Sequence, residues 1–514
     1  MLSIINSCAI VGLTSYLVKV EVDVANGLPC FDIVGLPDTL IRESKDRVRT
    51  AIKNSGFQFP LQRITVNLSP AHLRKEGSQY DLPIAIGILI ATGQLKSTDL
   101  EDNVLVGELS LNGDIIPVSG ILVMADSLAK MENSPKNLLT SVVNSHEGAI
   151  VKNLKVFGFA SLNSLVNHFI NSPTKPVEFV FPNNTDENDN TYDFSRVRGQ
   201  EDAKRALEIG ASGQHNLIMV GPPGSGKTML AKSFPTILPA LTLPEQIELT
   251  KIYSIAGMLP KNNPLIYKRP FIGPHHSCSL TSLVGGGKNP KPGLLSLASH
   301  GILFLDELTE FSRDALEALR QPLEANEVTV ARLNLTVTYP ASFQLIAALN
   351  PCPCGYLNHP TKACTCSTLQ QNRYIKKLSG PLLDRIDIQV QLPPVDFDVL
   401  QHNSSAPPES STIQQRVVAA RKRQRQRWDK YNLNIPANAL VPVNIFKKET
   451  AMTKEALKLL KNAFSRLSLT ARSHDKIIKT AMTIADLDKS DKINSTHMGE
   501  AIQYRGLDRF WTSE

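Results

Sequence analysis

The sequence has little cysteine, few aromatic residues, a small net charge and no long hydrophobic run. Seven cysteines among 514 residues are too few for a secreted disulfide framework, and the first lysine, Lys19, comes too late for the basic start of a signal peptide. The longest apolar run, 82–91, is about half the length that spans a bilayer. These absences predict a cytoplasmic protein without a membrane segment. The net charge, 55 − 48 = +7, is modest, so the placement of the charges matters more than their sum.

The length predicts about three domains at roughly 150 residues each. Residues 1–170 alternate short β-branched strands with helical stretches, and 193–400 alternate helices with apolar strands, which predicts a parallel sheet covered by helices. Polar and proline-containing stretches at 171–192 and 401–411 predict linkers, and 412–514 is expected to be all helical.

A phosphate-binding loop is the strongest motif. It reads Gly221-Pro222-Pro223-Gly224-Ser225-Gly226-Lys227-Thr228, follows an apolar strand at 217–220 and precedes a helix. Glycines let backbone N–H groups converge on phosphate oxygens, and the helix N-terminus adds a positive dipole end. We expect Lys227 to pair with the β- and γ-phosphates of ATP and Thr228 to ligate Mg²⁺.

Two further apolar strands end in polar residues. The strand at 302–305 leads into Asp306 and Glu307, which predicts a metal-binding carboxylate followed by one that polarises the attacking water. The strand at 345–349 leads into Asn350, whose amide is a candidate for holding that water. The alternatives are acidic residues at an ordinary strand exit and a turn asparagine before proline.

Two arginines are candidates for stabilising transferred phosphate. Arg385 follows an apolar turn and is flanked by carboxylates, so a structural salt bridge is an equal alternative. Arg472 lies at the start of a helix in the tail and is a candidate for reaching the γ-phosphate from the lid. Its alternative is a solvated arginine at a helix start.

These elements, in this order, resemble those of AAA+ ATPases of the magnesium-chelatase-like group. The resemblance to the ComM/YifB family is closer and covers nearly all 514 residues; it is carried further by residues 34–38, 67–71, 80–85, 274–277, 284–287 and 378–381. It implies an α/β fold with an S5/Lon-protease-like N-terminal domain, an AAA+ P-loop core with a parallel sheet, and an all-α C-terminal lid.

The resemblance also implies roles. It assigns the Walker elements to Lys227, Thr228, Asp306 and Glu307, and it makes Asn350 the sensor-1 residue. It further makes Arg385 an arginine finger offered to a neighbouring subunit, and Arg472 the sensor-2 residue. An arginine is common in the family where this sequence has Ile272.

Family members resemble homo-hexameric DNA helicases that act on single-stranded and branched DNA and drive branch migration of incoming DNA during natural transformation. Two other functions remain open. One is a chelatase motor subunit that drives metal insertion into a porphyrin, which the N-terminal domain disfavours. The other is a non-motor regulatory AAA+ ATPase that binds protein partners.

Residues 1–170 resemble the S5-like fold of Lon protease domains at 75–81 and 106–118. A Lon-type site needs a serine nucleophile and a lysine base within hydrogen-bond reach. The nucleophile position falls on Gln79, beside Ser78, and the stretch after Gly120 has no lysine before Lys130. We therefore expect a non-proteolytic domain that serves assembly or substrate handling.

Four cysteines lie within one short loop, 352–366. The pairs Cys352-Pro353-Cys354 and Cys364-Thr365-Cys366 are separated by nine residues, and four thiolates on one loop can enclose a tetrahedral Zn²⁺. The sequence thus predicts a structural zinc site, with four free thiols as the alternative.

Candidate DNA contacts come from three basic features. The alternating segment 327–338 predicts a hairpin with Arg332 near its tip, and in related AAA+ helicases a hairpin there points into the ring pore. Lys288 and Lys291 lie on a flexible basic insertion. The helix expected at 416–430 has seven basic residues and one acid, so it would attract phosphates. Solvated surface elements or a subunit contact are equally consistent with these features.

Overall fold

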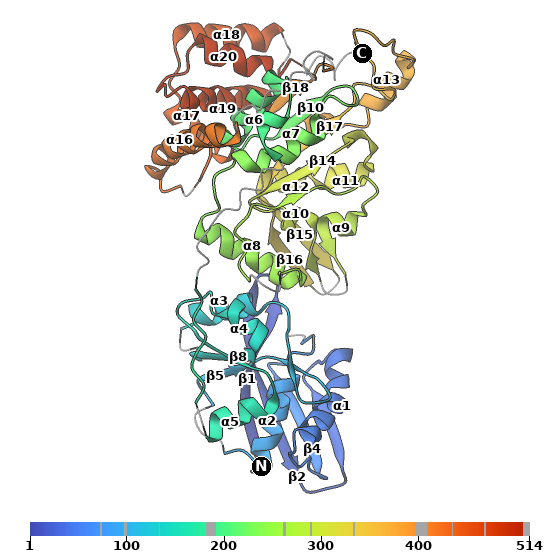
Figure 1. The fold of residues 1–514 in the computed structure, drawn as a ribbon, viewed down its shortest axis with the longest axis vertical. Helices are drawn as coiled ribbons and strands as arrows, with labels where there is room; N and C mark the ends of the chain where they lie inside the picture. Colours follow the sequence, from blue (N-terminus) through green and yellow to red (C-terminus); the bar gives the residue numbers. More distant parts are fainter. Residues whose placement is uncertain are drawn as a thin grey trace. The chain divides into compact units, whose positions relative to one another are not determined.

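The computed structural model of the chain divides into two compact units, each of which is described by itself (Figure 1). Unit 1 comprises Met1–Thr185, Leu243–Ile266 and Ala331–Tyr339, and unit 2 comprises Asp186–Thr242, Tyr267–Val330 and Pro340–Glu514. The structure describes residues 1–71, 75–96, 100–132, 134–171, 173–180, 192–260, 264–287, 290–332, 335–395, 409–433, 435–466 and 469–506, with the backbone alone at 332 and 335.

Unit 1 is built on a seven-stranded sheet of order β3-β4-β2-β1-β5-β8-β9. Alternate valines of β2, from Val18 to Val24, are buried while the residues between them are not, which confirms the period-2 pattern of this strand. The strands are β1 (Leu2–Val11), β2 (Thr14–Ala25), β3 (Cys30–Val34), β4 (Arg63–Ser69), β5 (Asn103–Leu105), β8 (Asn137–Ser141) and β9 (Lys155–Phe159), with a small separate pair, β6 (Glu108–Leu109) and β7 (Ile115–Ile116).

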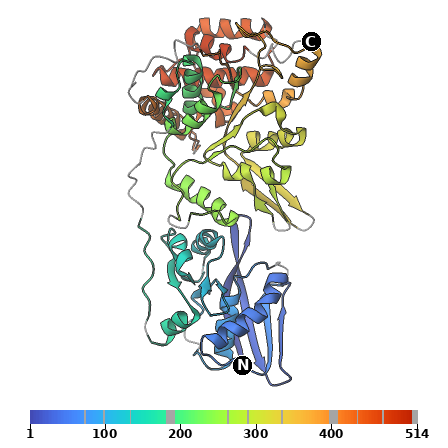
Figure 2. The ribbon, with the colours of Figure 1, turned by 45° about the vertical axis from the view of Figure 1, so that its right-hand side comes forward.

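The apolar run at 82–91 forms the central helix of unit 1. Every residue of α2 (Asp81–Ala91) is buried, and the helix packs across β1 and β2. Gly87 permits this close approach, because a Cβ there would lie 2.6 Å from Val22 Cγ2. Figure 2 shows the neighbouring helix α1 beside the strands; the remaining helices of the N-terminal segment are α1 (Thr39–Asn54), α3 (Ile121–Lys130), α4 (Val142–Gly148) and α5 (Leu162–Ile170).

Unit 1 also includes α8 (Leu243–Ala256), which comes from the middle of the chain. The buried Ser254 hydroxyl donates to the Glu147 carboxylate and accepts from the Gly120 N–H at 2.9 Å. Lys251 pairs with Asp126 nearby. Buried polar contacts of this kind hold α8 on the N-terminal segment, because each buried group needs its partner.

Unit 2 is built on a five-stranded parallel sheet of order β11-β14-β17-β10-β18. The strands are β10 (Leu217–Val220), β11 (Phe271–Ile272), β14 (Ile302–Leu305), β17 (Gln344–Leu349) and β18 (Ile388–Gln391). The helices that accompany them are α6 (Glu201–Gly213), α7 (Lys227–Ser233), α9 (Leu280–Val284), α10 (Leu294–Leu297), α11 (Arg313–Ala318), α12 (Arg320–Ala325), α13 (Thr368–Ile375) and α14 (Gly380–Leu383). The predicted mixed α/β fold with a parallel sheet is confirmed.

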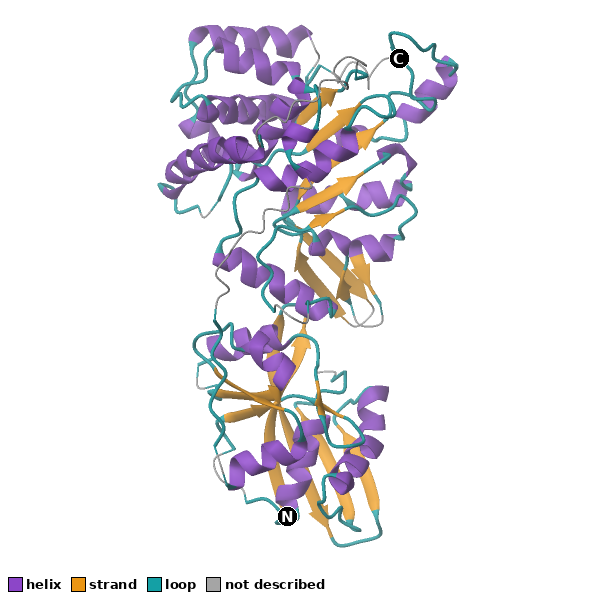
Figure 3. Ribbon diagram, viewed as in Figure 1, coloured by secondary structure: helices purple, strands orange, loops and turns teal. Residues whose placement is uncertain are grey.

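The described residues after β18 form a helical region, as predicted (Figure 3). Its helices are α16 (Ser410–Asp429), α17 (Val443–Glu449), α18 (Lys454–Arg466), α19 (Ala471–Leu487) and α20 (Ser495–Gln503). Trp428 is fully buried among them and donates its indole N–H to Asn438 Oδ1 at 3.0 Å.

The predicted linkers lie largely outside the described residues, because 172, 181–191 and 401–408 are not described. Helix α16 begins at Ser410, inside the second predicted linker. Among the described helices, none combines the length and apolarity that a membrane crossing requires.

Candidate nucleotide-binding site

Three polar segments meet at the carboxyl edge of the parallel sheet of unit 2. The phosphate loop follows β10, Asp306 follows β14 and Asn350 follows β17, and these three strands are hydrogen-bonded neighbours. Parallel strands end at a common edge, which is where ligands bind in open α/β sheets. The sheet order therefore brings together residues that lie more than 120 positions apart in the sequence.

The lysine and threonine of the phosphate loop contact the two other segments. Lys227 is buried, and its Nζ donates to Gly221 O at 2.7 Å, Pro222 O at 2.9 Å and Asn350 Oδ1 at 3.3 Å. Burial lowers the pKa of Lys227 to about 8. Thr228 Oγ1 donates to Asp306 Oδ2 at 2.8 Å. A hydroxyl and a carboxylate oxygen side by side are the donor set that Mg²⁺ prefers, so these two residues fit the metal.

Glu307 lies beside a histidine that sequence reasoning missed. Its side chain is 57% exposed, its backbone is left-handed with φ of +51°, and its Oε2 lies 3.5 Å from His276 Nδ1. The sequence did contain a signal: His276 follows β11, and β11 is the neighbour of β14 in the sheet. Side chains after adjacent parallel strands meet at the same edge, but the sheet order was not available from the sequence.

Arg385 and Arg472 meet at one carboxylate oxygen. Arg385 Nη2 lies 2.7 Å and Arg472 Nη2 lies 3.4 Å from Glu324 Oε1 on α12. The Arg385 side chain is only 11% exposed, whereas that of Arg472 is 58% exposed. The salt bridge considered as the alternative for Arg385 is therefore present, and Glu324 is a partner that the sequence pattern did not indicate.

Both arginines lie toward the amino edge of the sheet, opposite the phosphate loop. Arg385 comes three residues before β18, and Arg505 connects the two regions by donating to Ile386 O at 2.6 Å and to Ser473 Oγ at 3.1 Å. A four-residue strand such as β10 separates the two edges by roughly 13 Å. The roles of Arg385 and Arg472 toward ATP stay predictions.

Comparison with known proteins identifies the family. The chain is 40% identical to the uncharacterized protein YifB of Salmonella typhimurium over 517 residues, which cover 99% of this chain and 98% of the relative. It is 40% identical to YifB of Escherichia coli over 513 residues, with the same shares covered, and 39% identical to the competence protein ComM of Haemophilus influenzae over 517 residues, again 99% and 98%. The chain belongs to the ComM/YifB family.

Family models agree with this assignment. Those described as magnesium chelatase subunit ChlI match residues 20–141 and 193–400, and one for the C-terminal part of that subunit matches 408–505. The chain is thus a ComM-type, magnesium-chelatase-like AAA+ protein, and this membership implies ATP and Mg²⁺ as its ligands. The arrangement of Lys227, Thr228 and Asp306 fits ATP and Mg²⁺ as ligands.

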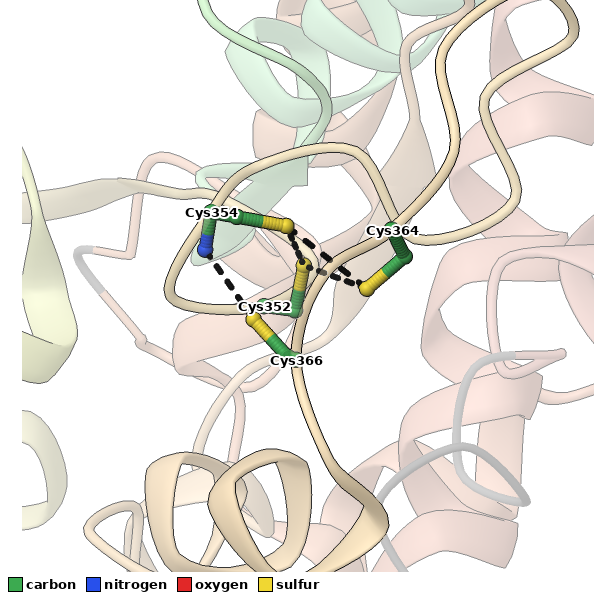
Figure 4. A group of neighbouring side chains, drawn as sticks. All are labelled: Cys352, Cys354, Cys364 and Cys366. Carbon is green, nitrogen blue, oxygen red and sulfur yellow. Dashed lines mark hydrogen bonds between the residues drawn. The ribbon is translucent and has the colours of Figure 1, made fainter.

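The four cysteines of the loop 352–366 in this chain converge into one cluster (Figure 4). Their sulfur atoms all lie within 4.8 Å of one another; Cys352 Sγ is 3.4 Å from Cys354 Sγ and 3.7 Å from Cys364 Sγ, and Cys366 Sγ accepts from the Cys354 N–H at 3.3 Å. Four tetrahedral thiolates at 2.3 Å from zinc place their sulfurs about 3.8 Å apart. The cluster therefore has the dimensions of a zinc site.

The candidate DNA contacts are only partly described. Lys288 lies outside the described residues, and Arg332 ends β15 (Glu327–Arg332), where its side chain is not described. Lys291 lies exposed on the short strand β13 (Lys291–Pro292). The predicted hairpin is present, because β15 pairs with β16 (Leu335–Pro340), and the stretch Ala331–Tyr339 groups with unit 1.

Four arginines of the basic helix α16 are held by contacts within unit 2, three of them by acidic side chains. Arg416 pairs with Glu208, Arg423 with Asp491 and Arg427 with Asp486, while Arg421 donates to Ala211 O at 2.6 Å. The adjoining face of the helix, which includes Val417 and Trp428, is buried. Much of the charge that made this helix a DNA candidate stabilises the attachment of the helix itself.

The protease-like motif of the N-terminal segment holds a serine and a carboxylate. Ser78 donates to Glu108, and the buried Lys75 donates to Gly35 O at 3.3 Å. A carboxylate beside the serine does not provide the lysine base of a Lon-type site. That this domain does not cleave peptides stays a prediction.

Proposed function

We propose that this chain is an ATP-driven, ring-forming DNA helicase that promotes branch migration of incoming DNA during natural transformation. The observation that carries the proposal is the joined nucleotide site, in which Lys227 contacts Asn350 and Thr228 contacts Asp306. The relative named competence protein ComM supports the biological setting.

The residues of the site divide the chemistry of ATP hydrolysis among them. Lys227 and the loop N–H groups bind the phosphates, and Thr228 and Asp306 hold Mg²⁺, which neutralises phosphate charge when bound. Glu307 accepts the proton of the attacking water, and Asn350 orients that water.

A second subunit completes the site. Arg385 and Arg472 lie near the edge opposite their own phosphate loop and share Glu324, so we propose that both stabilise phosphate charge on a neighbouring subunit's nucleotide. Contacts between unlike edges of identical chains generate closed rings, and a homo-hexamer is the proposed assembly.

The cysteine cluster is proposed to hold one structural zinc per chain. Elemental analysis of protein purified without added metal tests this directly, since zinc bound by thiolates is released by chelator or by acid. Clearly substoichiometric zinc together with four titratable thiols would reject the site.

The deciding experiment is DNA-stimulated ATP turnover together with branch migration of a synthetic four-way junction. A helicase is expected to show DNA-stimulated ATP turnover and to move the junction. A chelatase motor is expected to show neither DNA stimulation nor junction movement, and a regulatory ATPase is expected to hydrolyse ATP without moving the junction. Phosphate contacts release counterions, so DNA binding should weaken steeply as salt rises and should show little base preference.

The DNA path is proposed to follow the hairpin and the basic insertion. Arg332→Ala is expected to uncouple ATP turnover from strand separation more than it lowers basal turnover. Unchanged unwinding by Arg332→Ala and by a Lys288→Ala/Lys291→Ala variant would move the path to another surface.

A further inference from the structure

The cysteine loop is seated against the phosphate loop by a glycine. Gly355 is buried and has φ of +82°, a conformation that favours glycine. A Cβ at this position would lie 2.6 Å from Pro223 Cδ and 3.9 Å from Asn350 Cγ. Gly355 therefore fits between the phosphate loop and the residue proposed to orient water.

Covalent and polar links join the cysteine loop, Asn350 and the phosphate loop. Cys352 follows Asn350 by two residues and is fully buried, and the Gly355 N–H donates to Cys352 O at 2.9 Å. Asn350 in turn accepts from Lys227. Residues 357–360 of the cysteine loop and Gly221-Pro222 of the phosphate loop also line one pocket of about 220 Å³.

We infer that the four-cysteine loop is a brace for the nucleotide site, so that a metal held by Cys352, Cys354, Cys364 and Cys366 fixes the phosphate loop and Asn350 in their working positions. The two arms of the loop bring their cysteines into one cluster (Figure 4), and Gly355 lies on the first arm, one residue from Cys354. Four thiolates on one metal would lock these arms together. Without the metal, the arm that contacts Pro223 and Asn350 loses its anchor. This inference rests on the proposed ATPase and zinc site, and it adds that metal occupancy controls nucleotide binding.

The first test separates the brace from the metal site itself. Gly355→Ala needs a shift of about 0.8 Å to bring the 2.6 Å approach to the ordinary 3.4 Å, and a misplacement near 1 Å can lower turnover about a hundredfold. We expect this variant to keep its zinc and its melting temperature within a few degrees of wild type. Its affinity for a fluorescent ATP analogue should fall about tenfold or more, the size of one charge-assisted hydrogen bond.

Gly499→Ala is the control. Gly499 lies in α20, away from the nucleotide site and from Arg385, and a Cβ there has nothing within 4 Å. This variant should match wild type in zinc content, melting temperature, affinity and turnover. Normal affinity and turnover in Gly355→Ala overturns the brace.

The second test keeps the sequence unchanged. Zinc is removed from the full-length protein with a chelator, and folding is followed by circular dichroism while ATP-analogue affinity is measured. We expect affinity to fall as in Gly355→Ala and to return when zinc is added back.

Control of nucleotide binding by the metal is overturned if zinc removal leaves the ATP-analogue affinity unchanged, or if the wild-type protein contains no zinc. Both outcomes can be read even if Gly355→Ala does not fold. Because the second test reads only nucleotide affinity, zinc content and folding, loss of DNA-stimulated ATP turnover would reject the proposed helicase without changing the outcome of that test.

Discussion

Replacing Glu307 by glutamine tests the proposed division of labour at the carboxyl edge. Glutamine keeps the side-chain length but cannot accept the proton of the attacking water, a role that contributes typically about 10²- to 10⁴-fold, or roughly 3–5 kcal/mol. The side chain is 57% exposed, so the change in unfolding free energy should stay within about 0.5 kcal/mol. Asp306, not Glu307, contacts Thr228, so nucleotide affinity should change less than about twofold.

The assay measures steady-state ATP turnover and ATP-analogue affinity on the same preparation. Glu310→Gln is the matched control, because Glu310 lies three residues further on, is 45% exposed and pairs with Lys377 at 3.5 Å. We expect the Glu307 variant to bind ATP, to hydrolyse it at least about a hundredfold more slowly and to accumulate as a stable ring, while the control behaves as wild type. Normal turnover by Glu307→Gln would refute the assignment of the general base.

The remaining predictions concern the arginines and the attachment of α8. Arg472→Ala and Lys227→Ala should each be inactive alone. In mixed rings, roughly one quarter of the interfaces combine an intact Lys227 from one subunit with an intact Arg472 from its neighbour, and these interfaces should regain turnover. No recovery in rings shown to be mixed would argue against action of Arg472 on a neighbouring subunit. Ser254→Ala should lower the unfolding free energy by about 1–3 kcal/mol in thermal or urea unfolding, because it leaves the buried Glu147 carboxylate and the Gly120 N–H without this partner. An unfolding free energy equal to that of wild type would show that water replaces the hydroxyl.

The sequence predicted best those features that depend on local chain order. The phosphate loop, the strand before Asp306 and the strand before Asn350 each combine a short apolar run with polar residues at a fixed offset, and each lies where the pattern indicated. The cysteine pairs are likewise local, since two C-x-C pairs nine residues apart can approach one another on a single loop, as they do here.

The features that the sequence did not predict depend on which elements are neighbours in space. His276 and Glu307 meet because β11 pairs with β14, and Glu324 meets two arginines that lie 61 and 148 positions further along the chain. Helix α8 shows the same limit, because its buried polar partners lie more than 100 positions earlier. No composition or periodicity within α8 distinguishes it from a helix that covers the parallel sheet.

Charge density had the least value as a guide. The segment 416–430 has nearly the whole net charge of the chain, yet the acidic partners of Arg416, Arg423 and Arg427 come from α6 and from residues 486–491. A run of basic residues indicates only that negatively charged groups lie nearby. Acidic side chains of the same unit can supply that negative charge as well as DNA phosphates can. Since ion pairs and exposed phosphate contacts use the same guanidinium N–H groups, the paired arginines of α16 are poorly suited to bind DNA without first breaking bonds that hold the helix in place. This competition disfavours Arg416, Arg423 and Arg427 as DNA contacts, whereas the exposed Lys422, Arg425 and Lys430 of the same segment do not face it.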